Sequence, residues 1–91
     1  MEFTCNPIKN DTNIRDRSQP LLAAKVIFNS GMMVREDTRK AYPERRFIGY
    51  NAIDGRLMAV VFSVSAADHI PIISFRKADR REQTKFTNQS L

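Results

Sequence analysis

Residues 44–65 read ERRFIGYNAIDGRLMAVVFSVS and carry the clearest strand pattern of the chain. Two runs in this stretch favour β-strands, Glu44 to Ala52 and Arg56 to Ser65. Between them Asp54-Gly55 is a strong signal for the turn of a β-hairpin. The longest apolar run, Leu57 to Phe62, is far shorter than the roughly 20 apolar residues of a membrane span. The stretch therefore predicts two antiparallel strands and no membrane segment.

Two further strands and a helix are expected around this hairpin. Met32 to Asp37 favours a strand before it, followed by a polar loop from Thr38 to Pro43. After the hairpin, Ile70 to Phe75 favours another strand, and Ala78 to about Thr87 favours a polar helix. The second half of the chain thus predicts a meander of four strands that ends in a helix.

The first half of the chain favours one strand and two helices. Glu2 to Cys5 is a short strand with Phe3 inward, and Asn6-Pro7 combines a helix cap with a proline at the first helical position. The first helix is expected from Pro7 to about Arg17, with Ile8 and Ile14 on its apolar side. The second helix, Leu21 to Phe28, is apolar around most of its circumference, which predicts that it is largely buried in the core.

The order of elements, β-α-α-β-β-β-β-α, predicts an α+β fold. Because the helices and strands are segregated, we expect an antiparallel sheet with the helices packed on one face. The other face of such a sheet is free to bind a partner. Ninety-one residues without a repeat or linker predict a single domain, residues 1–91.

Charge points to a polyanionic partner. Fifteen Lys and Arg against ten Asp and Glu give a net charge of +5, which favours nucleic acid over a merely solubilising surface. A single cysteine, Cys5, and a single histidine, His69, give no zinc spacing, and no phosphate-binding glycine loop is present. We therefore expect no cofactor or metal. The N-terminus lacks the features of a signal peptide, so we expect a cytoplasmic protein.

A basic segment follows the last predicted strand. Arg76 to Lys85 contains five cations and two acids. On a helix that starts near Ala78, Arg81 and Lys85 share a face, with Arg80 beside them. Arginine grips phosphate oxygens through two parallel hydrogen bonds, which makes the segment a candidate RNA-binding surface. A solvated helix face with intrahelical ion pairs is the competing interpretation.

A second basic group begins the first strand of the hairpin. Glu44 precedes Arg45-Arg46, and RNA cleavage without a metal needs a base for the ribose 2′-hydroxyl and cations for the phosphate. A carboxylate among arginines can supply both. A surface ion pair is the alternative interpretation of Glu44.

Taken together in chain order, these residues resemble the BrnT toxins of bacterial type II toxin–antitoxin systems. The likeness covers nearly the whole chain and is most specific in its last segment, which resembles the family's I-I-S-A-R-K-A followed by R-R-E and an aromatic residue. The residues that carry it are Phe3, Pro7, Lys9, Asn13, Ala24, Val26-Ile27-Phe28, Glu44-Arg45, Ile48-Gly49, Gly55-Arg56-Leu57, Val60-Val61, Ile72 to Ala78, Glu82 and Phe86.

The resemblance implies a RelE-like fold and an endoribonuclease that stops growth by cutting RNA without a metal. It also implies a partner, a ribbon-helix-helix antitoxin similar to BrnA, in a complex of two toxins with an antitoxin dimer. Promoter DNA would be contacted only through that antitoxin.

The chain departs from the family pattern at several positions. Where the family has Lys-His-Gly after the first helix, this chain has Asp16, Arg17 and Ser18, and Cys5-Asn6 replaces Trp-Asp. Pro71 stands where an arginine precedes I-I-S, and Phe75 replaces an alanine. Proline cannot attract phosphate and removes a ladder hydrogen bond, which suggests an edge or bulged position.

The candidate site combines both sources of inference. Arg76, Lys77, Arg80 and Arg81 are expected to contact phosphate with help from Arg45. Glu44 is the candidate base and Glu82 its rival, while Arg17 replaces the family's histidine. Two alternatives stay open: a catalytically weakened homologue that binds the antitoxin in promoter autoregulation, and a basic structural module bound to ribosomes or nucleic acid.

Overall fold

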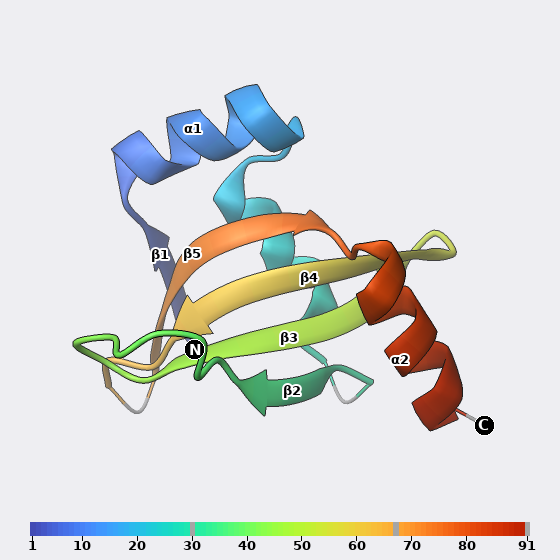
Figure 1. Cartoon of the computed structure of the whole chain (residues 1–91). Helices are drawn as coiled ribbons and strands as arrows, with labels where there is room; N and C mark the ends of the chain where they lie inside the picture. The colour runs from blue at the N-terminus through green and yellow to red at the C-terminus, as the bar shows by residue number, and fades with distance from the viewer. Residues whose placement is uncertain (30, 67, 91) are drawn as a thin grey trace.

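The structure is a computed structural model that describes residues 1–29, 31–66 and 68–90. Five strands form one sheet in the order β1-β5-β4-β3-β2 (Figure 1). The α+β class and the predicted order of elements are confirmed. The elements are β1 (Glu2–Cys5), α1 (Pro7–Arg17), the 3₁₀-helix η1 (Leu21–Ile27), β2 (Met33–Glu36), β3 (Arg46–Ile53), β4 (Arg56–Ser63), β5 (His69–Lys77) and α2 (Arg80–Ser90).

The predicted hairpin is present and is formed by β3 and β4. Ile53 pairs with Arg56 across the two-residue turn. Asp54 and Gly55 both have positive φ, 50° and 77°, as a type I′ turn requires. Strand β3 begins at Arg46 and not at Glu44, so Glu44 lies in the loop between β2 and β3.

The sheet is mixed, and the expectation of a purely antiparallel sheet is wrong. β1 pairs with β5 in parallel, while the other three pairings are antiparallel. The chain leaves β1 through α1 and η1 and re-enters the sheet at its opposite edge with β2. Pro71 therefore lies in an inner strand, opposite Thr4 of β1. It sits just beyond the Phe62–Ile72 pair that ends the β4 ladder after a register shift.

Helix α1 has the predicted bounds but presents the opposite side to the sheet. The Asn6 side chain accepts hydrogen bonds from the first free amides of the helix, as expected. Ile8 and Ile14, however, are exposed, whereas Asn13 is buried. The Asn13 side chain donates to the carbonyl of Phe75 at 2.8 Å and accepts from its amide at 3.2 Å. The pairing of β1 with β5 ends at Ile72, so the amide and carbonyl of Phe75 have no partner strand on that side. The Asn13 side chain faces inward because it supplies those two hydrogen bonds.

Element η1 is a 3₁₀-helix and buries one stripe only. Leu21, Ala24 and Ile27 are fully buried at a spacing of three residues, which is the period of a 3₁₀-helix. Leu22 and Val26 are exposed, so the expectation of burial around most of the circumference is wrong. A seven-residue element of this period can cover the sheet with a single row of side chains.

The helices do not share one face of the sheet. η1 covers the face that carries the main core, and the Asn51 side chain on this face donates to the Ile27 carbonyl at 3.0 Å. The neighbouring residue, Tyr50, points to the other face and donates to Glu82 of α2. Figure 1 accordingly shows η1 (cyan) behind the sheet, whereas α2 (red) lies in front, at the end of the sheet that carries the turn between β3 and β4. The expectation that the helices pack on one face is therefore wrong.

Candidate functional site

Helix α2 is fixed to the end of β5 by reciprocal hydrogen bonds. The Glu82 amide donates to Asp79 Oδ1 at 2.8 Å, and the Asp79 amide donates to Glu82 Oε1 at 2.9 Å. This is a capping box, which satisfies two of the free amides at a helix start. The cap at Asp79 explains why the helix begins at Arg80, two residues later than the sequence indicates.

Glu82 lies at the centre of a network that joins the helix to three strands. Arg76 of β5 donates to both of its carboxylate oxygens, at 2.6 and 3.1 Å. The Tyr50 hydroxyl of β3 donates to Glu82 Oε2 at 2.7 Å. That hydroxyl in turn accepts a hydrogen bond of 3.2 Å from Arg35 of β2.

The network holds Glu82 ionised and Tyr50 protonated. Burial raises the pKa of Glu82, but the hydrogen bonds from Arg76, Tyr50 and the Asp79 amide outweigh it, and the pKa falls to about 2. The pKa of Tyr50 is raised, mainly by burial and by its hydrogen bond to the Glu82 carboxylate. At neutral pH neither group is therefore suited to accept a proton.

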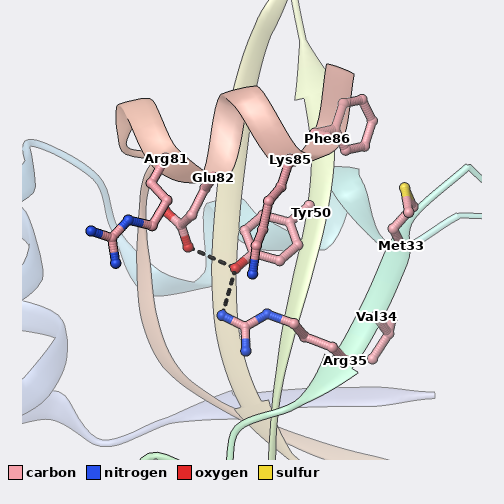
Figure 2. Close-up of a pocket in the computed structure, with 8 residues that line it drawn as sticks. All are labelled: Met33, Val34, Arg35, Tyr50, Arg81, Glu82, Lys85 and Phe86. Atoms are coloured by element: carbon pink, nitrogen blue, oxygen red, sulfur yellow. Dashed lines mark hydrogen bonds between the residues drawn. The ribbon is translucent and has the colours of Figure 1, made fainter. Parts of the chain in front are cut away.

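A hollow of about 160 Å³ opens beside this network, between α2 and strands β2 and β3. We call it the α2–β2 pocket. Figure 2 shows the nitrogen-bearing ends of Arg35, Arg81 and Lys85 on the side of the Tyr50 hydroxyl, with Met33 and Phe86 on the other side of the ring. The lining residues are Met33, Val34, Arg35, Tyr50, Arg81, Glu82, Lys85 and Phe86.

The rim of this pocket carries uncompensated positive charge. Arg35, Arg81 and Lys85 are exposed, and none of them has an ion-pair partner among the residues that the structure describes. Glu82, the acid that lines the pocket, is already neutralised by Arg76. Three cations that line one pocket can hold a phosphate group and stabilise negative charge that develops on it.

Of the residues predicted for the site, three come together here. Arg76 and Glu82 form the ion pair beneath the pocket, and Arg81 lines it. The side chain of Arg76 is only 17% exposed, so it positions Glu82 and α2. Arg81 and Lys85 share one face of the helix, as their spacing predicts.

Glu44 and Arg45 lie elsewhere. Arg76 pairs with Ala59, which pairs with Tyr50, and Tyr50 is four residues along β3 from Arg46. At about 3.3 Å per residue, Arg46 is roughly 13 Å from this level, and Glu44 lies in the loop that precedes Arg46. Glu44 pairs with Arg46 at 3.5 Å, which is the surface ion pair considered from the sequence. Arg45 pairs with Glu36 at 2.9 Å.

The remaining predicted residues are also outside the pocket. Lys77 follows Arg76 on β5 and therefore points to the opposite face of the sheet. Arg80, the first residue of α2, is exposed and does not line the pocket. Arg17 lines a second hollow of about 290 Å³ between α1 and β5, together with Lys9 and Ser74.

Sequence reasoning did not identify Tyr50 and Arg35 as site residues. The two-residue turn at Asp54-Gly55 sets the register that places Tyr50 opposite Ala59, so the hairpin carried a signal for that position. No comparable signal placed Arg35, because the predicted meander pairs this strand with the next one but the polar loop between them does not fix the register of the pair. Both residues are brought to α2 by tertiary structure.

Two further findings concern metals and membranes. Within residues 1–29, 31–66 and 68–90, no three histidine, cysteine, aspartate or glutamate side chains lie close enough together to hold a metal ion. Among the helices in this part of the chain, none has both the length and the apolar character needed to cross a membrane.

Comparisons with known proteins agree with the fold. The crystal structure of the Brucella abortus ribonuclease toxin BrnT superimposes with a TM-score of 0.69 at 20% identity, covering 88% of this chain and 99% of that one. No curated protein matches the sequence. The model of the family described as the ribonuclease toxin BrnT of type II toxin–antitoxin systems matches residues 6–82. The chain therefore belongs to the BrnT family of ribonuclease toxins of type II toxin–antitoxin systems.

Proposed function

We propose that this chain is a metal-independent endoribonuclease that inhibits growth by cleaving RNA bound at the α2–β2 pocket. Its membership of a ribonuclease toxin family supports the activity. The observation that carries the location is the group of three exposed cations that line this pocket, Arg35, Arg81 and Lys85, which have no ion-pair partner among the described residues.

The chemistry asked of the pocket is charge stabilisation. In cleavage without a metal, the ribose 2′-oxygen attacks the adjacent phosphorus as its proton passes to water. The bond to the 5′-oxygen breaks as that oxygen takes a proton from water, which leaves a 2′,3′-cyclic phosphate and a 5′-hydroxyl. Negative charge on the phosphate oxygens rises in the transition state, and Arg81, Lys85 and Arg35 are placed to offset it. Arg76 and Glu82 act as positioning residues because their contacts are with each other and with α2.

The partner we propose is a ribbon-helix-helix antitoxin, in a complex of two toxins with an antitoxin dimer. Membership of a toxin–antitoxin family supports an antitoxin partner. In this proposal promoter DNA is contacted by the antitoxin alone, and the complex acts in the cytoplasm.

A second function, a catalytically weakened homologue that serves as the antitoxin's partner in repression, is favoured by one observation. Of the two carboxylates considered as the base, Glu82 has a pKa of about 2 and is fully engaged, and Glu44 lies far from Arg76. In that case the protein binds its antitoxin but leaves RNA intact.

Induced expression in bacteria separates the two functions. The proposed ribonuclease predicts growth arrest with loss of cellular RNA for the wild type, and relief of both in the Arg81→Ala/Lys85→Ala double variant. A Lys25→Ala/Lys40→Ala variant is the matched control, because it removes the same charge from exposed positions on η1 and in the loop before β3. The control should arrest growth like the wild type.

The opposite result identifies the second function. A wild type that leaves growth and RNA unchanged, yet co-purifies with a ribbon-helix-helix partner, contradicts the ribonuclease and supports the weakened homologue. Equal relief by the site and control variants would show that net charge, rather than the α2–β2 pocket, supports the toxic effect.

A further inference from the structure

We propose that the α2–β2 pocket holds one unstacked nucleotide, with its phosphate at the cationic rim and its base against the apolar wall. The inference rests on the proposed function, since it specifies the form of RNA that this site accepts. It adds that the substrate is single-stranded where it meets the pocket.

The apolar wall is the first observation. Met33 lies on the edge strand β2 opposite Tyr50, and it is 36% exposed although it is a large apolar side chain. Phe86 lines the same hollow from α2. Apolar and aromatic side chains that border a basic surface are the usual platform for nucleobases, because every base has an apolar face.

The polar rim is the second observation, and it lies on one side of the pocket. The Arg35 guanidinium is hydrogen-bonded to the Tyr50 hydroxyl at 3.2 Å and lies 5.9 Å from the centre of its ring. Arg81 and Lys85 bring two more positive charges to the same side (Figure 2). A phosphate bound among them would leave the attached base directed toward Met33 and Phe86.

The third observation is the preformed geometry and small size of the hollow. Its floor is fixed, because Tyr50 is held by Glu82, and Glu82 is held by Arg76 and by the helix cap. Its volume, about 160 Å³, suits a single planar group rather than a stack of bases. Bases inside a duplex are stacked and paired, so a nucleotide can enter only from a single strand, a loop or a bulge.

The methionines of the chain provide a direct test. Of its four methionines, Met33 lines the pocket, whereas Met58 is 4% exposed in the main core. With methyl-labelled methionine, titration with adenosine 5′-monophosphate should shift the Met33 methyl signal upfield through the ring current of the base, and leave Met58 unchanged. Ribose 5-phosphate, which has the phosphate but no base, should compete for the site without that upfield shift.

Variants then test the two halves of the pocket. Lys85→Ala should weaken nucleotide binding about fivefold, as expected for one exposed charged contact of about 1 kcal/mol. Lys40→Ala, which removes an equal charge from an exposed loop, should leave binding unchanged. Phe86→Ala, which removes the aromatic side chain from the apolar wall, should weaken binding of adenosine 5′-monophosphate and reduce the upfield shift of Met33.

Each opposite result overturns the inference. An equal Met33 shift with ribose 5-phosphate would show a phosphate site with no place for the base. A shift with a glutamate-rich peptide but none with the nucleotide would assign the pocket to an acidic protein partner. Cleavage assays on the same sample keep the two proposals separate. Cleavage of single-stranded RNA without any Met33 shift overturns the nucleotide pocket and leaves the ribonuclease standing. An upfield Met33 shift without RNA cleavage overturns the ribonuclease and leaves the nucleotide pocket standing.

Discussion

Arg76 at the end of β5 and Glu82 in the first turn of α2 form a two-point ion pair, with contacts of 2.6 and 3.1 Å. The two side chains are only 17% and 11% exposed. The Glu82 carboxylate also accepts hydrogen bonds from the Asp79 amide at the helix start and from the Tyr50 hydroxyl. The ion pair therefore sets the position of α2 over the sheet. The cationic rim of the α2–β2 pocket depends on that position.

Removal of the Glu82 charge should destabilise the fold. Glu82→Gln keeps the size of the side chain but leaves the largely buried Arg76 without its counter-ion, and we expect a loss of about 2 kcal/mol in the free energy of unfolding. Urea denaturation measures it. Arg80→Ala, at an exposed position on the same helix turn, should change stability by less than about 0.5 kcal/mol. A similar loss in both variants would contradict the role of the ion pair.

Stability should also fall in acid because of this pair. The pKa of Glu82 is about 2 in the folded protein, below its ordinary value of 4.5. Its contribution is therefore complete above pH 4.5 and is lost as the pH falls from there toward 2. The pKa of Asp37 is also lowered, chiefly by hydrogen bonds from Arg39, so the wild type loses stability from two groups. The difference between wild type and Glu82→Gln should shrink to near zero at pH 2. A constant difference would contradict the assignment to Glu82.

Asn13 should be essential for the contact between α1 and the sheet. Its side chain satisfies both backbone groups of the buried Phe75 and also donates to the Gln19 carbonyl at 2.7 Å. Asn13→Ala leaves those groups unpaired, and we expect a loss of about 2–3 kcal/mol, with faster hydrogen exchange at the Phe75 amide. Thr12→Ala, on the exposed side of the same helix, is the control. Unchanged exchange at Phe75 would show that water replaces Asn13 there.

Cleavage should not need a divalent metal. RNA cut by the purified protein in buffer with EDTA should be cut at an unchanged rate when Mg²⁺ is added in excess. Activity that disappears in EDTA and returns with Mg²⁺ would contradict the metal-independent mechanism.

Local sequence signals predicted most of the elements, and long-range pairing explains the errors. Asp54-Gly55 placed the hairpin, and Asn6-Pro7 placed the start of α1, because turns and caps are determined by neighbouring residues. The parallel pairing of β1 with β5 has no local signal. Neither has the inward direction of Asn13, which depends on a bare stretch of backbone 62 residues away.

The site shows the same division. The spacing of Arg81 and Lys85 was enough to place them on one helix face, and both line the α2–β2 pocket. The charge pattern of the sequence does not distinguish these two cations from Arg76 and Arg45. In the fold, Arg76 forms an ion pair with Glu82, and Arg45 forms one with Glu36. Whether a cation is free to bind RNA depends on its folded neighbours.

RNA binding at the α2–β2 pocket should be visible in the salt dependence of RNA affinity. For single strands, log K falls with log salt at a slope of about 0.7 per phosphate neutralised. If Arg81 and Lys85 contact phosphates, Arg81→Ala/Lys85→Ala should reduce that slope by about 1.4, while Lys25→Ala/Lys40→Ala should leave it unchanged. A slope that is unaltered in the site variant, or reduced equally in the control, would contradict RNA binding at the α2–β2 pocket.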